Sequence, residues 1–475
     1  MMPPNESIHQ NGFTKVLLNI LLIVPLVVAG YLYGLASINA SKQVTSDHFI
    51  YDYREIYANH VQYRKEWGTD SFLLFKVKKY YFGVLKYERP SLTDQTYAGL
   101  DLLSSFFNKL SERNSQVRIA YYGDSGVEAD LVTQTLRDSL QQIFGGSGVG
   151  FIPVVSRDPG FRQSITHYFS NLWRWESLEN PRPMRKNPGI SGNSFYTQQI
   201  DSISDQTAWI SYRGKSFSSR TATFPSMRFF YGKNEIDQSN GFLEWEINKT
   251  QKSSPLDKNE LLNEISLFDF PVSQIRIKAN LPNSLPVYGF SIESTQGVIL
   301  DNFALRGIDG SRLTRIPIAL LKEFQHTLNY DLLIFSYGLN VTNPARRDYS
   351  EYEEKILQLI KHYRKAFPEV PILIIGPPDK GMGGPGNWVS DPSVPRITKA
   401  MRKAAIKSET AFISLYEVMG GQGSMVRWVE KERPRLASTD YTHFNYEGAD
   451  KISRELLHIF LAQTSTSPVS YTHLA

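Results

Sequence analysis

The sequence predicts an α/β fold: a doubly wound parallel-sheet domain, interrupted by an inserted antiparallel β-sandwich and preceded by an N-terminal transmembrane helix. Three observations lead to this prediction. Apolar strand-like runs alternate with amphipathic helices in two separate parts of the chain. Residues 158–296, between those parts, have a different pattern of short aromatic and β-branched runs. An uncharged apolar segment lies near the start. Strands that alternate with helices are typical of βαβ units and parallel sheets.

The first α/β part covers residues 96–157. "VRIAYY" (117–122) is mostly apolar, as expected of a parallel strand buried on both faces. The helix predicted over 128–144 has one apolar face, formed by Val132, Leu136, Leu140 and Ile143. "GGSGVG" then predicts a turn, and "FIPV" another strand.

The alternation resumes at residue 297 and continues to 465. Strands are predicted in "GVILDNFAL", "DLLIFSYG", "PILIIGPP" and "AFISLY". Helices are predicted in "IPIALLKEFQHTL", "YEEKILQLIKHYRKAF", "ITKAMRKAAIKS" and "EGADKISRELLHIFLA". This order favours a doubly wound sheet with helices on both faces.

The interruption at 158–296 contains short aromatic and β-branched runs such as "RTATFPSMRFFYG", "GFLEWEIN" and "FPVSQIRIKANL". Gly, Pro, Asn and Ser separate these runs, which is the pattern of an antiparallel β-sandwich. We therefore expect the α/β domain to be split by an inserted β module.

The two ends of the chain lie outside these domains. Residues 1–41 are interpreted as a cytoplasmic tip and membrane anchor, because no charged residue lies between Val16 and Ser41. A cleaved signal peptide ending at Ala40 is the alternative. Residues 42–95 are interpreted as a connector, and 466–475, including "VSYTHL", as a tail that resembles a sequencing-adapter scar.

Composition excludes several classes of function. The net charge is only +5 over 475 residues, with basic and acidic residues interleaved, so nucleic acid is not an expected partner. The absence of cysteine removes disulfides, thiolate metal sites and cysteine nucleophiles. "GGSGVG" lacks both the GxGxxG register and the Walker lysine, so no nucleotide is expected. No metal-ligand cluster is apparent, and no cofactor is expected.

Ser125 lies in "AYYGDSGVEADL", where a predicted buried strand gives way to a helix. Ligands bind outside the carboxyl ends of the strands in open α/β sheets, and free N–H groups at a helix start can stabilise an oxyanion. Ser125 is therefore a candidate nucleophile. The alternative is a helix N-cap without catalytic function.

A reactive serine needs a base and a group that orients the base. His443 in "STDYTHFNYEGAD" lies in a loop before the last predicted helix, and Asp440 precedes it by three residues. In a turn, this spacing lets the carboxylate accept from the imidazole Nδ1–H, which leaves Nε2 free. Capping or solvation of a polar loop remains the alternative for Asp-x-x-His.

Acyl transfer also needs donors for the developing oxyanion. Gly338 and Asn340 follow a predicted strand in "FSYGLNVT", and Gly307 in "ALRGIDGS" offers a backbone N–H after another strand. Each of these stretches alone could be an ordinary turn.

Together, the four strand ends carry Ser, Gly, Asn and Asp/His in an order that resembles the SGNH (GDSL) hydrolase family. The resemblance implies Ser125 as nucleophile, His443 as base and Asp440 as its orienting group. It also implies an oxyanion hole formed by the N–H groups of Ser125 and Gly307 and the amide of Asn340. Asp124 and Gly338 are the supporting residues of these motifs. Many members have Asp after the Asn, where this chain has Val341.

Two stretches, "LQQIFGGSGVGFIP" and "TAFISLYEVMGGQGSMVRW", resemble the exported peptidoglycan O-acetylesterase branch of the family. That resemblance implies that the insertion is similar to a carbohydrate-binding domain. Two interpretations are open for Met419, Met425 and Trp428. They either line the edge of the substrate site or pack in the core, and core packing is favoured.

The expected function is thus a membrane-anchored serine esterase that removes O-acetyl groups from a cell-wall or extracellular polysaccharide, most consistently peptidoglycan. The expected location of the catalytic domain is the periplasm or cell surface, with the acetylated polysaccharide as partner. A polysaccharide O-acyltransferase and a non-catalytic glycan-binding surface protein are the alternatives.

Overall fold

The computed structural model describes residues 96–180, 184, 188–198, 207–236 and 241–464. The chain divides into two units, Met1–Arg89 and Pro90–Ala475, and every described residue belongs to the second. The expected anchor and connector (1–95) and the expected tail (466–475) lie outside the described residues. Among the helices within the described ranges, none has the length and apolar character needed to cross a membrane.

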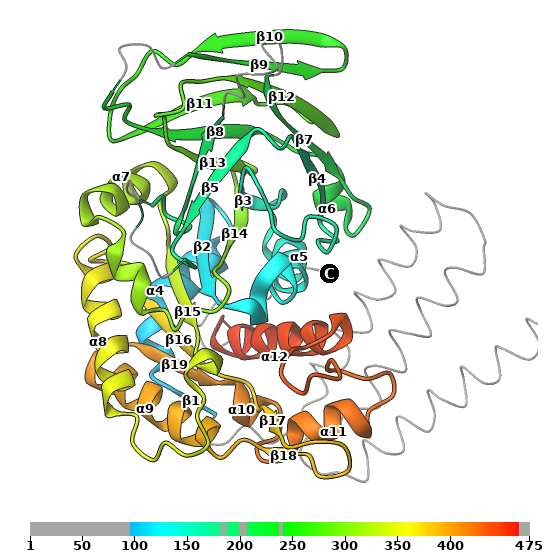
Figure 1. Ribbon diagram of the computed structural model, residues 1–475, viewed down its shortest axis with the longest axis vertical. Helices are drawn as coiled ribbons and strands as arrows, with labels where there is room; N and C mark the ends of the chain where they lie inside the picture. The colour runs from blue at the N-terminus through cyan, green and yellow to red at the C-terminus, as the bar shows by residue number, and fades with distance from the viewer. Residues whose placement is uncertain (1–95, 181–183, 185–187, 199–206, 237–240, 465–475) are drawn as a thin grey trace, which may run out of the picture. The chain divides into compact units, whose positions relative to one another are not determined.

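A six-stranded sheet forms the centre of the α/β part, as the sequence predicts. Its order is β1 (Tyr97–Ala98), β19 (Ala411–Ser414), β16 (Ile372–Gly376), β15 (Leu332–Ser336), β2 (Gln116–Gly123) and β14 (Gly297–Ala304). All pairs are parallel except that of β1 with β19. β2 pairs with β14 on one side and with β15 on the other, so the carboxyl ends of these two parallel strands flank its own (Figure 1).

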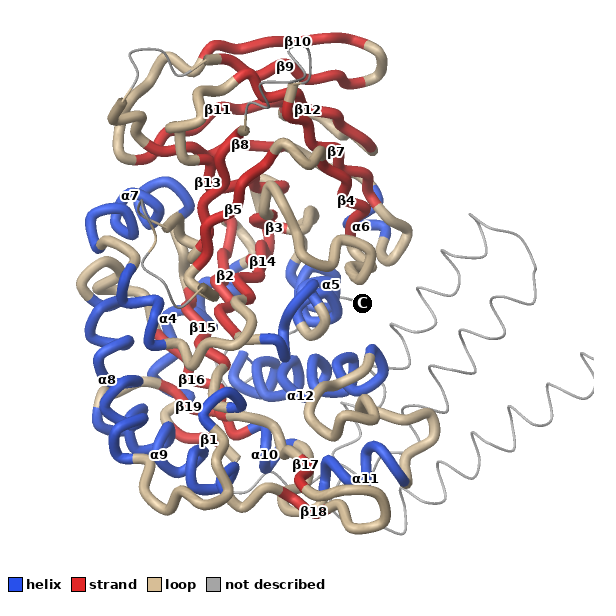
Figure 2. Tube along the Cα trace, viewed as in Figure 1, coloured by secondary structure: helices blue, strands red, loops and turns tan. Residues whose placement is uncertain are grey.

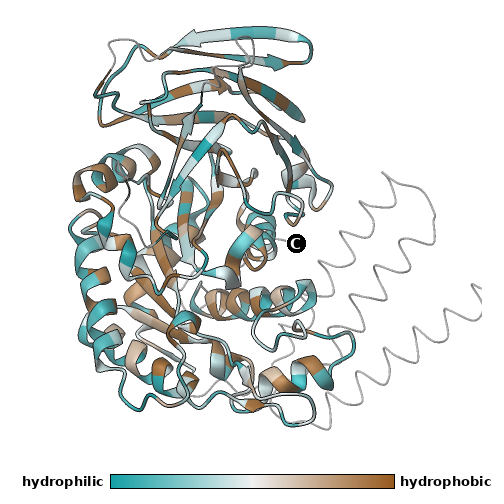
Figure 3. Cartoon of the chain, viewed as in Figure 1, coloured by the Kyte–Doolittle hydropathy of each residue, from teal (hydrophilic) through white to brown (hydrophobic). Residues whose placement is uncertain are grey.

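Two groups of helices cover the sheet (Figure 1). One group packs α12 (Tyr446–Thr464) against α4 (Ser104–Glu112) and α5 (Thr133–Phe144); the other consists of α7 (Ile318–Leu328), α8 (Ser350–Arg364) and α9 (Ser393–Lys407). The second group shares one apolar core with Ala120 and Tyr122 of β2. Figure 3 shows the apolar colouring of the sheet between the helices.

The insertion consists of two antiparallel sheets around a shared apolar core, as expected (Figure 2). The first sheet contains β10 (Thr250–Pro255), β9 (Phe242–Ile247), β12 (Gln274–Asn280), β7 (Ala208–Gly214) and β4 (Ile165–Phe169). The second contains β11 (Leu262–Phe268), β8 (Met227–Gly232), β13 (Val287–Ile292), β6 (Asn193–Thr197) and β5 (Trp173–Ser177). Along β12, exposed polar residues alternate with buried apolar ones, the period of a sheet with one buried face.

β3 (Gly150–Ile152) is the strand predicted at "FIPV", and it differs from the expectation in one respect. It pairs with β13 of the insertion rather than with the parallel sheet. The glycines of "GGSGVG" have a packing reason: a Cβ on Gly148 would lie 2.3 Å from the Ile292 carbonyl oxygen, and its φ of +95° favours glycine.

Short elements complete the described part of the chain. They are η1 (Leu100–Leu103), η2 (Ser125–Asp130), α6 (Ser219–Ala222), η3 (Ser311–Arg315), η4 (Leu339–Val341), β17 (Gly381–Met382), β18 (Val389–Ser390), α10 (Leu415–Val418) and α11 (Ser424–Glu430). The helix predicted over 128–144 begins later, at Thr133, because the 3-10 turn η2 precedes it.

A buried polar network joins the insertion to the central sheet. Arg118 of β2 is fully buried and donates to Asp301 of β14 at 2.8 Å and to Glu293, directly after β13. Burial alone would raise the pKa of Glu293, but Arg118 and Arg228 outweigh it and lower the pKa to about 2. Such groups are costly to bury unless they are paired, so the insertion and the sheet depend on each other.

Candidate active site

Ser125 lies two residues after the end of β2, at the carboxyl edge of the central sheet, as the first residue of η2. Asp124 is the N-cap of this turn, and its Oδ1 accepts from Gly126 N at 2.9 Å. The capping function considered for Ser125 therefore belongs to its neighbour, and the Ser125 hydroxyl has a different partner.

That partner is His443. Ser125 Oγ lies 2.9 Å from His443 Nε2, although the two residues are 318 positions apart in sequence. His443 Nδ1 lies 2.7 Å from Asp440 Oδ2, and the backbone N–H of His443 donates to Asp440 Oδ1 at 3.0 Å. With the proton on Nδ1 facing the carboxylate, Nε2 is free to accept from the serine hydroxyl. The structure thus brings the three predicted residues into one hydrogen-bonded line.

Asp440 is suited to remain ionised. Partial burial alone would raise the pKa of Asp440, but the hydrogen bonds from His443 and Thr442 lower it below its ordinary value. The carboxylate therefore persists into mildly acidic solution, where it can hold the imidazole tautomer.

Neighbouring segments hold the Asp440–His443 turn in place. The ring of Tyr441 stacks on Trp388 with centroids 3.9 Å apart, and the Tyr441 hydroxyl donates to Glu430 Oε1 at 3.0 Å. Gly381 N donates to Tyr441 O at 2.7 Å. These supports were not predicted from the sequence. Their distance along the chain from the turn left no local signal that could have revealed them.

Asn340 lies in η4, directly after the turn at Gly338. Its amide Nδ2 donates to Asp124 Oδ2 at 3.0 Å and to Ile308 O at 3.0 Å. Gly338 has a φ of +125°, and a Cβ there would lie 2.9 Å from the Pro377 ring. Glycine is thus required for the turn that carries Asn340 toward the nucleophile.

Asp124 is buried and bonded on both carboxylate oxygens. Burial raises the pKa of Asp124 to about 6, against the hydrogen bonds from Gly126 and Asn340 that lower it. The residue therefore links the nucleophile turn to the segment of the candidate oxyanion donor.

Gly307 lies in the exposed loop after β14, with a φ of +76°. Within the described residues, neither its N–H nor that of Ser125 donates to a protein acceptor. Both N–H groups are therefore available to a ligand. Gly310, three residues later, caps η3 and packs against the Tyr337 ring.

Other candidate residues have structural roles. Met419, Met425 and Trp428 are buried, so the core-packing interpretation is correct. His167 is buried in the insertion, where Nε2 lies 3.0 Å from Val154 O and burial lowers its pKa to about 3. In the described part of the chain, no group of three or more His, Asp or Glu side chains is arranged to hold a metal ion.

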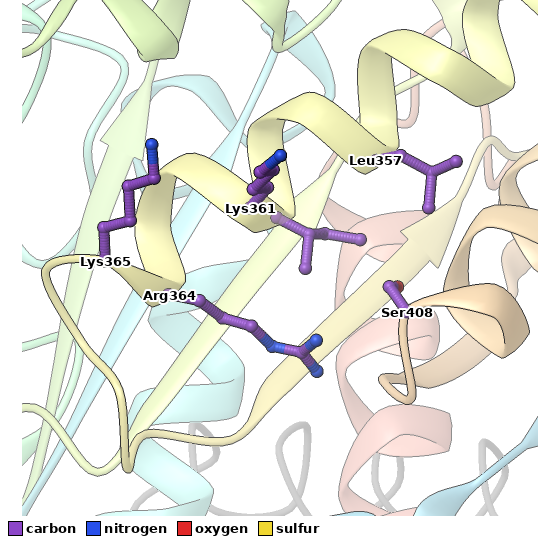
Figure 4. A pocket seen from close by; sticks show the side chains of 6 residues that line it. Leu357, Lys361, Arg364, Lys365 and Ser408 are labelled. Carbon is purple, nitrogen blue, oxygen red and sulfur yellow. The ribbon is translucent and has the colours of Figure 1, made fainter.

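A hollow of about 450 Å³ lies elsewhere, beside α8 and the residue that follows α9 (Figure 4). Its lining consists of Leu357, Ile360, Lys361, Arg364, Lys365 and Ser408. No residue of the Ser125 site lines this hollow, so it is not where the serine would react.

Comparison with known proteins supports the fold. No family model and no curated protein matches the sequence. A solved structure of a peptidoglycan O-acetylesterase matches with a TM-score of 0.61 and 19% sequence identity, over 79% of this chain and 99% of its own. The predicted resemblance is thereby confirmed at the level of the fold.

Two further solved structures match weakly. A family two carbohydrate esterase from Cellvibrio japonicus has a TM-score of 0.26 and 11% identity, over 64% of this chain and 98% of its own. An acetyl xylan esterase has a TM-score of 0.25 and 16% identity, over 34% of this chain and 81% of its own.

Proposed function

We propose that this protein is a serine esterase that removes O-acetyl groups from a polysaccharide, with peptidoglycan as the favoured substrate. The observation that carries the proposal is the line Ser125 Oγ–His443 Nε2 at 2.9 Å and His443 Nδ1–Asp440 Oδ2 at 2.7 Å. The fold shared with the solved peptidoglycan O-acetylesterase supports the choice of substrate.

The first half of the reaction acylates the enzyme. Ser125 Oγ bonds to the acetyl carbonyl carbon while His443 Nε2 takes the hydroxyl proton. The carbonyl oxygen gains negative charge and faces the N–H groups of Ser125 and Gly307. The bond to the sugar oxygen then breaks, and His443 returns the proton to that oxygen. The products are acetyl-Ser125 and a free sugar hydroxyl.

The second half regenerates the serine. A water molecule gives a proton to His443 Nε2 and bonds to the acetyl carbon through its oxygen. The Ser125 ester bond breaks, Ser125 Oγ regains the proton from His443, and acetic acid leaves and ionises to acetate in neutral solution. Asp440 stabilises the imidazolium in both halves without itself being protonated.

An acyltransferase would share the acetyl-serine intermediate and differ only in the acceptor, a sugar hydroxyl in place of water. The exposure of the Asp440–His443 turn favours water: the Asp440 side chain is 50% exposed. Mixing enzyme, acetyl donor and an unacetylated glycan separates the two, since transfer leaves acetyl on the glycan and hydrolysis releases acetate.

The decisive test compares wild type with Ser125→Ala on a small aryl acetate and on O-acetylated peptidoglycan. We expect acetate release by the wild type from both substrates and none above background by the variant, with unchanged thermal unfolding. Full activity in Ser125→Ala would overturn the proposal. If the wild type acts on the aryl acetate alone, the esterase activity stands and the polysaccharide substrate is wrong.

The proposal extends to location. An N-terminal anchor with an exported catalytic domain would place the site beside wall or surface glycans. Separating membrane from soluble fractions of cells that produce the full chain, with protease protection of the catalytic domain, tests this arrangement.

A further inference from the structure

The loop between β3 and β4 contains a tight turn beside the candidate active site. Within "DPGF", Phe161 N donates to Asp158 O at 3.1 Å, which closes a turn with Pro159 and Gly160 at its centre. A Cβ on Gly160 would meet no atom within 4 Å, so the turn extends into open space. We call residues 157–164 the rim loop.

The rim loop contacts three of the four segments that carry the candidate catalytic and oxyanion residues, those of Gly307, His443 and Ser125. Asp158 pairs at 2.7 Å with Arg306, the neighbour of Gly307. The Phe161 ring packs on Tyr446, three residues after His443. Arg162 and Ser164 donate at 2.9 and 2.7 Å to Asp130, five residues after Ser125. The insertion therefore reaches the immediate surroundings of the triad through this loop.

The contact with Asp130 is the rigid one. Asp130 is fully buried and also accepts from Arg137 at 2.7 and 2.8 Å. A buried carboxylate with this many charge-assisted bonds holds its partners in one geometry. The base of the rim loop is thereby fixed before any substrate arrives, and a prearranged surface loses less entropy on binding.

Phe161 and Tyr446 form a stacked pair that is open to solvent. Their ring centroids are 4.9 Å apart at an interplanar angle of 25°, and the Tyr446 hydroxyl donates to Phe161 O at 2.5 Å. Phe161 stays 44% exposed although its side chain is large and apolar. Tyr446 is three positions after His443, so their Cα atoms are within about 11 Å.

A single exposed phenylalanine needs no explanation on a protein surface. This one is distinguished because it is stacked, tethered by a hydrogen bond, and part of a loop whose buried base is bonded to the segment that carries Ser125. Rigid aromatic faces with a polar edge are typical of binding sites for amphipathic ligands. A pyranose is such a ligand, because the C–H face of its ring is apolar while its hydroxyls lie at the edge.

We propose that Phe161 and Tyr446 form an aromatic platform that binds a pyranose ring of the acetylated glycan beside Ser125 and His443. This inference rests on the proposed function and adds where the sugar lies. The platform combines one ring from the insertion with one from α12, so the insertion contributes directly to substrate binding at the active site.

The test measures kcat/KM on O-acetylated peptidoglycan fragments and on a small aryl acetate, and takes the ratio of the two. In Phe161→Ala and in Tyr446→Ala, the loss of one ring face lowers this ratio roughly five- to tenfold, mainly through KM for the glycan. Tyr446→Phe keeps the ring and restores most of the glycan rate. Phe161→Leu keeps apolar bulk but removes the ring, so we expect the same five- to tenfold fall in the ratio. It therefore tests the ring even if Phe161→Ala does not fold.

Phe242→Ala is the matched control. Phe242 lies on β9 of the insertion and is 42% exposed, close to the exposure of Phe161. It leaves the ratio unchanged if the platform is the sugar contact. An equal fall in Phe242→Ala, or an unchanged ratio in Phe161→Leu and Tyr446→Ala, overturns the platform.

These outcomes are separate from failure of the proposed function. If wild-type enzyme releases no acetate from any acetylated glycan, the function itself is wrong. If wild type and Ser125→Ala behave as proposed while the ratio stays constant in the ring variants, only the platform is lost.

Discussion

The Nδ2 amide of Asn340 donates to the buried carboxylate of Asp124 at 3.0 Å and at the same time to the Ile308 carbonyl oxygen at 3.0 Å. An amide nitrogen carries two hydrogens, so both are engaged in this state. To donate to an oxyanion, Asn340 must share or release one of these bonds. Ile308 belongs to the loop of Gly307, so the exchange would occur where the substrate carbonyl is expected.

Asn340→Ala tests whether that exchange takes place. If the amide donates to the oxyanion, kcat on an aryl acetate falls by about 10²–10³ with KM little changed. Asn343→Ala, in the exposed turn three residues later, is the control and keeps wild-type kinetics. An unchanged kcat in Asn340→Ala would limit Asn340 to supporting Asp124.

Asp124→Asn should alter the pH dependence of stability. The pKa of Asp124 is about 6 in the folded protein against 3.8 for an ordinary aspartate. Because the folded value is raised, the contribution to stability is present below the ordinary pKa and is lost as pH rises through about 6. The lost amount is on the order of 3 kcal/mol, from two pKa units.

We therefore expect the free energy of unfolding of wild type to fall relative to Asp124→Asn between about pH 4 and pH 6. Urea unfolding across this range measures the difference, and the hydrogen bonds changed by the substitution add only a constant offset. Parallel curves for the two proteins would show that Asp124 titrates normally.

Asp440→Asn should cost rate without loss of the fold. The amide oxygen keeps the bonds from the backbone N–H groups of Thr442 and His443, so the amide NH2 faces Nδ1 and favours the tautomer with its proton on Nε2, which cannot accept from Ser125. We expect kcat to fall by up to roughly 10⁴-fold. Asp450→Asn is a suitable control because, among the described residues, Asp450 forms an exposed pair with Arg454. A near-normal kcat in Asp440→Asn would show that Asp440 is not needed to orient His443 for catalysis.

Asp130→Ala should destabilise the protein strongly. Burial alone would raise the pKa of Asp130, but Arg137 and Arg162 hold it well below the ordinary value. Removing the carboxylate leaves two buried guanidinium groups without their partner, at a cost of about 3–5 kcal/mol. Denaturant unfolding at neutral pH measures this cost.

The control for Asp130 is Arg157→Gln, which removes a pair with Glu179 in which the Arg157 side chain is 47% exposed. Exposed pairs contribute about 1 kcal/mol or less. If the free energy of unfolding falls by similar amounts in both variants, the buried Asp130 network does not stabilise the attachment of the insertion.

The α/β class, the order of strands and helices, and the two-sheet insertion were predictable from the sequence. The reason is local: β2 is mostly apolar and β15 nearly so, α8 repeats its apolar residues every three or four positions, and β12 alternates. Such patterns depend on neighbours a few residues away, and burial then selects the same structure. The sequence also indicated Ser125, Asp440 and His443, because each follows a strand or precedes a helix in a polar turn.

Only the tertiary structure decided what these residues contact. The register of the sheet brings Ser125 to His443 across 318 positions, and it turns the Asn340 amide toward Asp124 and Ile308. β3 pairs with β13 because an antiparallel partner was available there, which no local pattern in "FIPV" could indicate. The stacking of Phe161 on Tyr446 likewise joins segments 285 residues apart. Contacts of this kind depend on how distant elements pack together, and local sequence patterns carry no record of that packing.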